Sequence, residues 1–299
     1  FHKDLAFTVQ QESQEIVGDL IQSTINNTGI TNICCSGGYF LNCVANYYLT
    51  KRFPNVNFYF EPISSDAGTS IGAARLLHLK HSPSTLFPKQ KVIYYGQQYS
   101  TNKLKESIDN KKNMFKQLKT TPQEIAKLIS ERNIVCIFQG RSEAGPRALG
   151  NRSILYDPTD PNGKDFVNTV KKREWFRPFA GTVLLEKAKE YFDMAGLEES
   201  PFMMYAMDVW PDKQNKIPCI THVDGTCRIQ TLTKEQNPHY YKLIQEFEKI
   251  TGIPILFNTS FNLAGDPLVE TIEDALETIL KSELKYLYLP ELEMLLEKK

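Results

Sequence analysis

Apolar residues recur at helical spacing through the first 28 residues of the chain. Asp4 can cap this helix and Gly29 can end it, so a long N-terminal helix is expected. Alternating elements follow, with strands at 30–35 and 57–60 and helices at 41–50 and 69–81. A strand, a glycine turn, a helix and a second strand in this order predict an α/β layer.

The pattern breaks at Ser82–Pro88 and returns near Thr121. Between them, residues 99–119 are polar and rich in lysine, and we expect a solvated, exposed stretch. Thr121 and Glu124 form a capping box that opens the next helix. Later elements are strands at 134–138, 181–185, 203–209, 253–257 and 285–289 and helices over 237–252 and from 271. The intervening residues have no clear period, so this half predicts an α+β unit with a mixed sheet.

The length of 299 residues and the hydrophobic content of 41% allow a large core and favour two domains. We expect one unit over residues 1–85, a linker and variable segment over 86–120, and a second unit over 121–299. The chain starts at Phe1 without an initiator methionine, which suggests a fragment of a longer protein.

Charge and composition argue against several classes of partner. Lysine plus arginine and aspartate plus glutamate both number 35, so no global charge favours nucleic acid or an anionic membrane. No apolar run approaches the length of a membrane span. The six cysteines include no C-x-x-C pair, which indicates reduced core thiols and a cytoplasmic protein. Any basic site must therefore be local.

Two basic clusters lie within about 35 residues. The first is the glycine-rich stretch QGRSEAGPRALGNRS (139–153), which follows an apolar strand and carries Arg141, Arg147 and Arg152. The second, KKREWFRPF (171–179), alternates basic with aromatic residues. Glycine lets backbone N–H groups approach an anion, and arginine matches pairs of phosphate oxygens. Each cluster alone is also typical of a solvated basic surface, but together they predict an oxyanion pocket.

A third polar stretch, NTSFN (258–262), follows another apolar strand. Hydroxyl and amide side chains at a strand end can bind phosphate or an adenine edge, although the same residues also serve as turns or helix caps. His222 in THVDGT (221–226) is either a substrate contact or a buried, hydrogen-bonded imidazole.

These stretches, together with RPFA (177–180), resemble the signature of the NodU/CmcH O-carbamoyltransferase family. The resemblance extends from about Ser36 to Leu289. It implies a partial actin/sugar-kinase-like ATPase layer over 1–85, followed over 121–299 by a YrdC-like domain with a twisted mixed sheet flanked by helices. The Lys-x-Arg and Ser-x-Asn elements of that domain match KKR at 171–173 and SFN at 260–262.

The resemblance also implies roles for individual residues. Carbamoyl phosphate and the phosphates of ATP would be held by Arg147, Lys171, Arg173, Arg177, Arg228 and Ser260. Further cofactor contacts would come from Arg141, Arg152, Asn258 and Asn262, and Mg²⁺ would accompany ATP.

The N-terminal segment carries two weaker matches. SGGYFLN (36–42) is similar to the family's phosphate turn and implies nucleotide contacts from Gly37, Gly38 and Asn42. SDAGTS (65–70) adds Gly68 and Asp66, an aspartate that in the family completes a site for Fe²⁺ or a similar divalent metal. The two histidine ligands of that site belong to a His-x-x-x-His element, which none of the five histidines here forms. We therefore expect the histidines in an absent N-terminal half of the same protein.

The implied function is ATP-dependent O-carbamoyl transfer. Carbamoyl-adenylate would form from carbamoyl phosphate and ATP, and its carbamoyl group would pass to a hydroxyl of a small-molecule acceptor such as a sugar, an antibiotic or a nodulation factor. Three alternatives stay open: a threonylcarbamoyl-adenylate synthase-like enzyme of tRNA modification, a non-catalytic nucleotide- or RNA-binding module, and a fragment that binds nucleotide without transfer. Membranes and nucleic acid are not expected partners.

Overall fold

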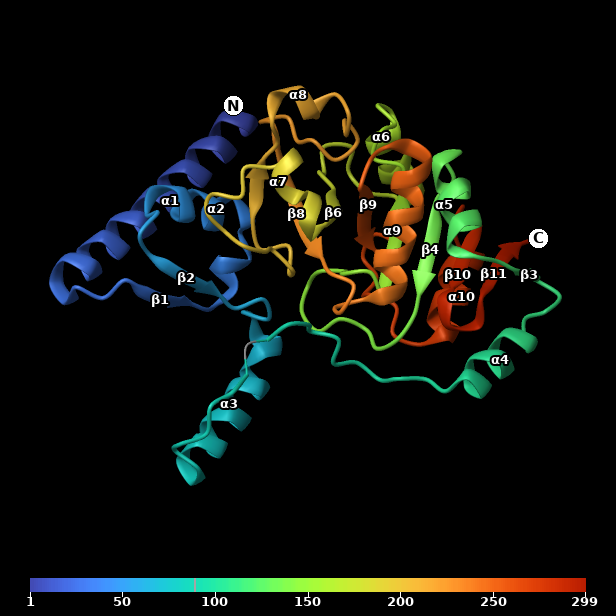
Figure 1. Cartoon of the computed structure of the whole chain (residues 1–299), viewed down its shortest axis with the longest axis horizontal. Helices are drawn as coiled ribbons and strands as arrows, with labels where there is room; N and C mark the ends of the chain where they lie inside the picture. The colour runs from blue at the N-terminus through green and yellow to red at the C-terminus, as the bar shows by residue number, and fades with distance from the viewer. Residues whose placement is uncertain (89) are drawn as a thin grey trace.

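A computed structural model describes residues 1–88 and 90–299 of the chain and contains two sheets (Figure 1). The smaller sheet pairs two parallel strands, with Cys35 opposite Phe60. Its elements are α1 (His2–Thr28), β1 (Asn32–Cys35), the 3-10 helix η1 (Gly38–Leu41), α2 (Cys43–Arg52), β2 (Asn57–Phe60) and α3 (Asp66–His81). The predicted order of strands and helices in this segment is confirmed.

The larger sheet is mixed and has nine strands in the order β3-β11-β10-β4-β5-β9-β6-β8-β7. Two of its neighbouring pairs, β10 with β4 and β6 with β8, are parallel, and the others are antiparallel. The strands are β3 (Phe115–Lys119), β4 (Val135–Phe138), β5 (Arg152–Tyr156), β6 (Ala180–Leu184), β7 (Ala206–Asp208), β8 (Thr226–Leu232), β9 (Ile255–Ser260), β10 (Tyr286–Leu289) and β11 (Met294–Lys298). The prediction of a mixed sheet in the second half is therefore confirmed.

Helices cover this sheet and close its core. Helices α5 and α9 pack against each other (Figure 1). α5 also contacts β4 and β5, and α9 contacts β6 and β9. The helices are α4 (Thr101–Asp109), α5 (Pro122–Ser130), α6 (Gly163–Val170), α7 (Ala188–Tyr191), α8 (Pro211–Gln214), α9 (Pro238–Thr251) and α10 (Ile272–Leu280), with short 3-10 helices η2 (Leu185–Lys187) and η3 (Pro290–Leu292). Apolar side chains such as Leu155, Phe257 and Leu276 are fully buried between the layers, and their removal from water stabilises the fold.

One hydrophobic cluster joins the small sheet to the large one. Phe60 at the end of β2 meets Tyr205 edge to face, with ring centroids 5.7 Å apart. Polar contacts support this packing, because the Asn46 side chain donates to the carbonyl of Met204 at 2.9 Å and the Tyr47 hydroxyl donates to that of Asp193 at 3.0 Å. The N-terminal segment is therefore docked on the edge of the large sheet next to β7.

The expectation of a solvated stretch over residues 99–119 is wrong. Leu104 and Ile108 lie one turn apart on α4 and are buried, and Phe115 is buried at the start of β3. β3 then pairs antiparallel with β11 at the edge of the large sheet. The lysines misled the prediction because they occupy the solvent-facing side of an amphipathic helix and an edge strand. The large sheet thus begins before residue 121.

The residues after β4 are also more regular than expected. β5, α6 and β8 lie in the stretch between 139 and 236, and β5 and β8 are central strands of the large sheet. β9 continues through Ser260, so Asn258 and Ser260 project from a strand and do not follow it. β5 and β8 were missed because they carry arginine and glutamine among their apolar residues, and the polar end of β9 was taken for the residues after the strand.

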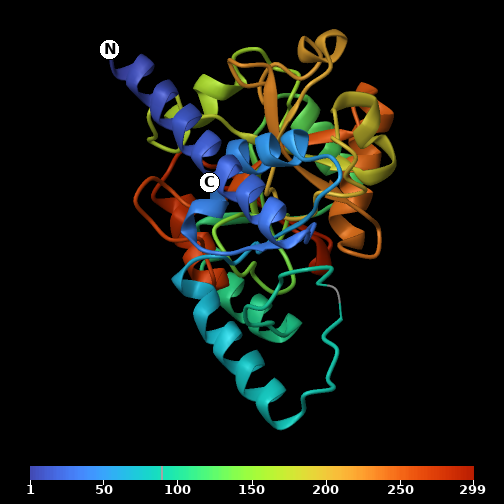
Figure 2. The ribbon, with the colours of Figure 1, turned by 90° about the vertical axis from the view of Figure 1, so that its left-hand side faces the viewer.

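α3 extends away from the rest of the molecule in both views (Figures 1 and 2). None of its residues is buried, and Leu76 and Leu77 are largely exposed. Among the described residues, no helix combines the length and the apolar character that crossing a bilayer requires.

Candidate functional site

Eight of the sequence-predicted residues line two neighbouring cavities: Arg147, Lys171, Arg173, Arg177, Arg228, Asn258, Ser260 and Asn262. Two adjoining cavities of about 590 and 370 Å³ share Arg173, Arg177 and Ser260 as lining residues. We call this combined space the cationic pocket, defined by Arg147, Lys171, Arg173, Arg177, Arg228 and Ser260. Its side chains come from the loop after β4, from the residues after α6, and from β8 and β9.

A buried carboxylate shapes the glycine-rich loop that carries Arg147. Glu143 Oε1 accepts the backbone N–H of Leu149 at 2.7 Å and of Asn151 at 2.8 Å. The loop also needs glycine at position 150, where φ is 106° and an added Cβ would lie 2.2 Å from the Tyr240 ring. Sequence reasoning missed Glu143. Its signal is a single acidic residue within a run of three arginines.

Arg147 and Arg228 line the same cavity, and neither has an ion-pair partner among the described residues. The Arg147 Nε and the Arg228 Nε are both buried, and in the described part of the chain neither has a hydrogen-bond partner. Burial, followed by the nearby Arg228 charge, lowers the pKa of Arg147 to about 10. Two neighbouring guanidinium groups with unpaired buried N–H donors are suited to an anion that supplies both charge and acceptor oxygens.

Lys171 is the most deeply buried cation of the pocket, with 1% of its surface exposed. Its Nζ donates to the carbonyl of Ser260 and, at 3.0 Å, to Asn262 Oδ1. These two acceptors leave the ammonium one further proton to donate. Burial, followed by repulsion from Arg173, lowers the pKa of Lys171 to about 7. The amine is therefore poised to gain its charge when an anion enters.

Arg173 and Arg177 connect the two cavities. Burial lowers the pKa of Arg173, and the charges of Arg177 and Arg228 lower it further. Arg177 is more exposed and its Nε donates to Glu174 at 2.6 Å. The exposed ring of Phe176 lies at the edge of the smaller cavity. At the rim of the pocket, the charge of Arg177 is therefore balanced by Glu174. In the interior, Arg147 and Arg228 have no carboxylate partner among the described residues.

Asn258 lies on the floor of the smaller cavity, and 1% of its surface is exposed. Its amide nitrogen donates to the Ala148 carbonyl at 3.3 Å and to Thr182 Oγ1 at 3.0 Å. Its Oδ1 is buried and has no partner among the described residues. The Asn262 side chain is placed nearby through its contacts with Lys171 and Ser260.

Two predicted contacts, Arg152 and Arg141, are not brought to the cationic pocket. Arg152 is fully buried and donates to the carbonyls of Gln139, Gly140, Asn151 and Glu270. Its guanidinium also lies 3.6 Å from the centre of the Phe138 ring. Arg141 is exposed and donates to the Gly96 carbonyl at 3.0 Å. The structure therefore gives Arg152 a role in holding the loop and places Arg141 outside the site.

His222 is a hydrogen-bonded imidazole next to β6. Its Nε2 donates to the Phe179 carbonyl at 2.9 Å, and its Nδ1 lies 3.1 Å from Thr226 Oγ1. Burial lowers the pKa of this ring, so it is neutral at physiological pH. Both ring nitrogens have partners, and His222 serves to hold the segment that follows Arg177.

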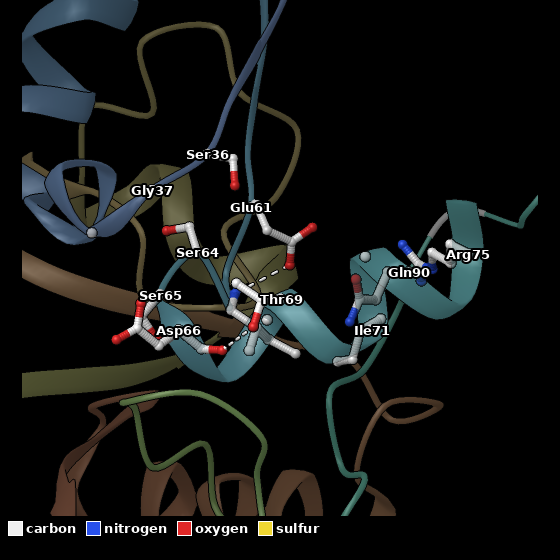
Figure 3. A pocket seen from close by; sticks show the side chains of 14 residues that line it. Ser36, Gly37, Glu61, Ser64, Ser65, Asp66, Thr69, Ile71, Arg75 and Gln90 are labelled. Atoms are coloured by element: carbon white, nitrogen blue, oxygen red, sulfur yellow. Dashed lines mark hydrogen bonds between the residues drawn. The ribbon is translucent and has the colours of Figure 1, made fainter. Parts of the chain in front are cut away.

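A second cavity of about 380 Å³ lies between η1 and the start of α3 (Figure 3). We call it the turn pocket, and its lining includes Ser36, Gly37, Gly38, Asp66 and Gly68. Gly68 is required there, since an added Cβ would lie 2.0 Å from the Ile63 carbonyl oxygen. Asn42 has another role, because its Oδ1 accepts the Ala45 N–H at the start of α2.

The residues of the turn pocket do not form a metal site by themselves. Asp66 and Glu61 bring carboxylates to the cavity, but its described lining residues include no histidine. Across residues 1–88 and 90–299, no group of three or more histidine, cysteine, aspartate or glutamate side chains could hold a metal ion. One carboxylate oxygen of Glu61 already accepts the Ile63 N–H at 3.1 Å (Figure 3).

Both halves of the chain match families of known proteins. Residues 126–298 match the family described as Carbamoyltransferase C-terminus, and residues 2–75 match Carbamoyltransferase N-terminus. The chain is 36% identical over 293 residues to nodulation protein NolNO of Sinorhizobium fredii. The aligned region covers 95% of this chain and 42% of NolNO. It is 35% identical over 288 residues to nodulation protein NolO of Bradyrhizobium diazoefficiens, covering 95% and 53%. The chain spans about half the length of the curated relatives it matches.

Solved structures with a more distant likeness include full-length HypF in its phosphate- and nucleotide-bound form. The TM-score is 0.40 at 20% identity, over 53% of this chain and 23% of HypF. HypF from T. kodakarensis gives a TM-score of 0.37 at 16% identity, over 56% and 21%.

Proposed function

This chain belongs to the carbamoyltransferase family, and we propose that its cationic pocket binds carbamoyl phosphate together with ATP and forms carbamoyl-adenylate. The observation that carries this proposal is the pair of buried, unpartnered guanidinium N–H groups on Arg147 and Arg228. The phosphates of both substrates supply the negative charge and the acceptor oxygens that these groups lack.

The proposed reaction needs no nucleophilic side chain. Carbamoyl phosphate first reacts with water to give carbamate and inorganic phosphate. A carbamate oxygen then attacks the α-phosphorus of ATP, the bond to the β-phosphate oxygen breaks, and pyrophosphate leaves. Negative charge gathers on the phosphate oxygens in the transition state, where fixed donors from Arg147, Lys171 and Arg173 stabilise it. The role of the protein is to position the two anions and to supply these charges.

Magnesium enters this reaction as part of its substrate, MgATP. Among the described residues that line the cationic pocket, the only carboxylate is that of Glu174, and Arg177 already pairs with it. The pocket therefore offers no carboxylate cage of its own, and the metal neutralises charge on the nucleotide phosphates.

Transfer to an acceptor hydroxyl is proposed for the whole protein. We propose that residues 1–85 belong to an actin-like transfer domain, with the turn pocket as part of its site, and that residues 86–100 are the linker. A YrdC-like unit then comprises α4, β3 and residues 121–299. The metal and its histidine ligands would belong to the part of the relatives' length that this chain does not span, and the acceptor is a small hydroxyl compound such as a sugar, an antibiotic or a nodulation factor.

Two other functions are separated from this one by simple assays. A threonylcarbamoyl-adenylate synthase would use threonine and bicarbonate in place of carbamoyl phosphate. An RNA-binding module would bind RNA with a strong dependence on salt. The match of both segments to carbamoyltransferases and the balanced net charge favour the first proposal over these.

Pyrophosphate exchange into ATP tests the proposal. The chain should incorporate labelled pyrophosphate only when carbamoyl phosphate is present. Arg147→Ala and Lys171→Ala should abolish this exchange and leave the far-UV circular dichroism unchanged. Arg141→Ala is the matched control, because it removes the same charge from the same loop outside the pocket. Normal exchange in both pocket variants would contradict the assignment.

A further inference from the structure

We propose that Asn258 selects carbamoyl phosphate over other acyl phosphates by accepting a hydrogen bond from its amino group. The inference rests on the proposed function, because it takes the cationic pocket as the site of carbamoyl phosphate. It adds a specificity-determining residue and names the group of the substrate that this residue recognises.

The orientation of the Asn258 amide is fixed by its partners. Its nitrogen donates to the Ala148 carbonyl at 3.3 Å, and a backbone carbonyl can only accept. The same nitrogen donates to Thr182 Oγ1 at 3.0 Å. A flipped amide would put two acceptor oxygens against each other at Ala148, so the nitrogen must lie on this side and Oδ1 on the other.

A second amide locks the hydroxyl group between them. Gln230 Nε2 donates to the Leu149 carbonyl at 3.0 Å, which fixes Gln230 Oε1 as an acceptor. Thr182 Oγ1 donates its proton to that Oε1 at 2.9 Å. The hydroxyl oxygen is then left to accept from Asn258, in agreement with the orientation set by Ala148. The Asn258 nitrogen also has a longer contact with Gln230 Oε1 at 3.5 Å, and among the described residues Asn258 Oδ1 is the atom of this amide that has no partner.

Asn258 Oδ1 is a buried acceptor in a pocket of donors. It has no hydrogen-bond partner among the described residues, and buried carbonyl oxygens are rarely left in that state. Asn258 lines the smaller cavity with four arginines, Arg147, Arg173, Arg177 and Arg228. Ser260 Oγ does not compete for the same role, because it donates to Asn262 Oδ1 at 2.6 Å. The pocket therefore pairs abundant donors for oxygen with a fixed acceptor for a ligand N–H.

Carbamoyl phosphate has this combination of groups. Its phosphate and carbonyl oxygens take hydrogen bonds from arginine, and its amino group has to give one. Acetyl phosphate has nearly the same shape but carries a methyl group at that position. It would leave Oδ1 buried and unpaired, and sites built to bind an N–H group reject analogues that lack it. Aspartate would be a poor substitute at 258, since its charge would pair with the arginines and weaken the hold on phosphate.

Calorimetric titrations of the chain in the cold with carbamoyl phosphate and with acetyl phosphate test this inference. The unaltered chain should bind carbamoyl phosphate at least about tenfold more tightly. Asn258→Leu keeps the branching and the number of side-chain heavy atoms and removes the acceptor, so the ratio of the two dissociation constants should fall to about one. Thr182→Val is the control. It removes one partner of the amide nitrogen but keeps Oδ1 and the Ala148 contact, so the ratio should persist even if both affinities weaken.

The ratio separates recognition from structural support. If Asn258→Leu weakens both ligands equally and leaves the ratio unchanged, Asn258 is only a structural residue and the inference fails. If the unaltered chain binds both ligands equally well, the inference fails while the proposed function stands, and this test holds even if Asn258→Leu does not fold. If the unaltered chain binds neither ligand, the proposed function itself is contradicted.

Discussion

The cationic pocket and the turn pocket solve different problems with different means. The first is built from charged side chains that the large sheet buries and aims, with Lys171 and Arg228 lacking any carboxylate partner in the described chain. The second is built from a glycine turn and the start of α3, a helix with no buried residue. The contrast indicates that the cations of the cationic pocket all come from this chain, and we propose that the turn pocket is part of a larger site.

The two pockets are nevertheless joined by one loop. Arg147 Nη2 donates to the Leu41 carbonyl of η1 at 2.9 Å, and a Cβ on Gly145 would lie 3.1 Å from the Pro62 carbonyl oxygen. The loop that carries the central arginine of the cationic pocket therefore also reaches the turn pocket, since a Cβ on Gly145 would lie 3.6 Å from Cγ1 of Ile63, which lines it. Variants with a substitution in only one pocket test whether the two pockets act independently.

The largest expected effect is the difference between removing a charge from the cationic pocket and removing one from the turn pocket. Arg228→Ala should reduce pyrophosphate exchange about a thousandfold, because a fixed donor to the transition state is lost. Asp66→Asn in the turn pocket should leave exchange within about twofold, since the adenylate forms elsewhere. Equal losses in both variants would contradict the separation of the two pockets.

Truncating a leucine to alanine should lower stability much more in the large sheet's helical layer than on α3. Leu276 on α10 is fully buried, so Leu276→Ala should lower the free energy of unfolding by about 3 kcal/mol. Leu76 on α3 is 71% exposed, and Leu76→Ala should change it by less than about 0.5 kcal/mol. Urea unfolding measures both values. A large loss for Leu76→Ala would show that α3 is covered in solution.

Lys171 gives the cationic pocket a pH dependence near neutral pH. Because its pKa is lowered to about 7, the amine is charged below that value and loses its charge as the pH rises through it. The affinity for sulfate, whose charge stays constant, should fall about tenfold between about pH 6 and about pH 8. Lys171→Arg should remove this dependence, since arginine stays charged. A flat profile in the unaltered chain would contradict the lowered pKa.

The smallest effect is expected at the rim. Glu174 pairs with Arg177 at 2.6 Å, and both side chains are about half exposed. Glu174→Gln frees Arg177 and should raise sulfate affinity by no more than about threefold, as exposed ion pairs contribute little. Lys187→Ala, which breaks an exposed pair with Glu190 away from the pocket, is the control and should have no effect. A tenfold gain would mean that the rim is as desolvated as the interior.

Local patterns in the sequence were sufficient for several elements of the fold. Asn237, Pro238 and Gly252 mark the ends of α9, and the structure places that helix at Pro238–Thr251. β3 was missed because an edge strand tolerates lysine on its solvent face. The order of the nine strands was also out of reach, since it depends on pairings between segments far apart in the sequence.

The same limit applies to the site. The basic and polar motifs predicted a pocket for an oxyanion, and the structure brings Lys171, Arg173 and Ser260 together. The sequence could not show that Arg152 is buried and donates hydrogen bonds to four backbone carbonyls. This residue lies only three positions after the GPRAL stretch (145–149) of the signature. Nor does the sequence reveal that Asn258 Oδ1 is left unpaired, because this depends on the contacts of Thr182 and Gln230.

The central claim is that the converging cations hold a phosphorylated carbamoyl donor and activate it on ATP. Crystals soaked with carbamoyl phosphate and MgATP test it most directly. The account predicts density for an adenylate between Arg147, Lys171 and Ser260, with its carbamoyl nitrogen beside Asn258 Oδ1. Nucleotide bound only in the turn pocket, with the six residues of the cationic pocket untouched by ligand, would contradict it.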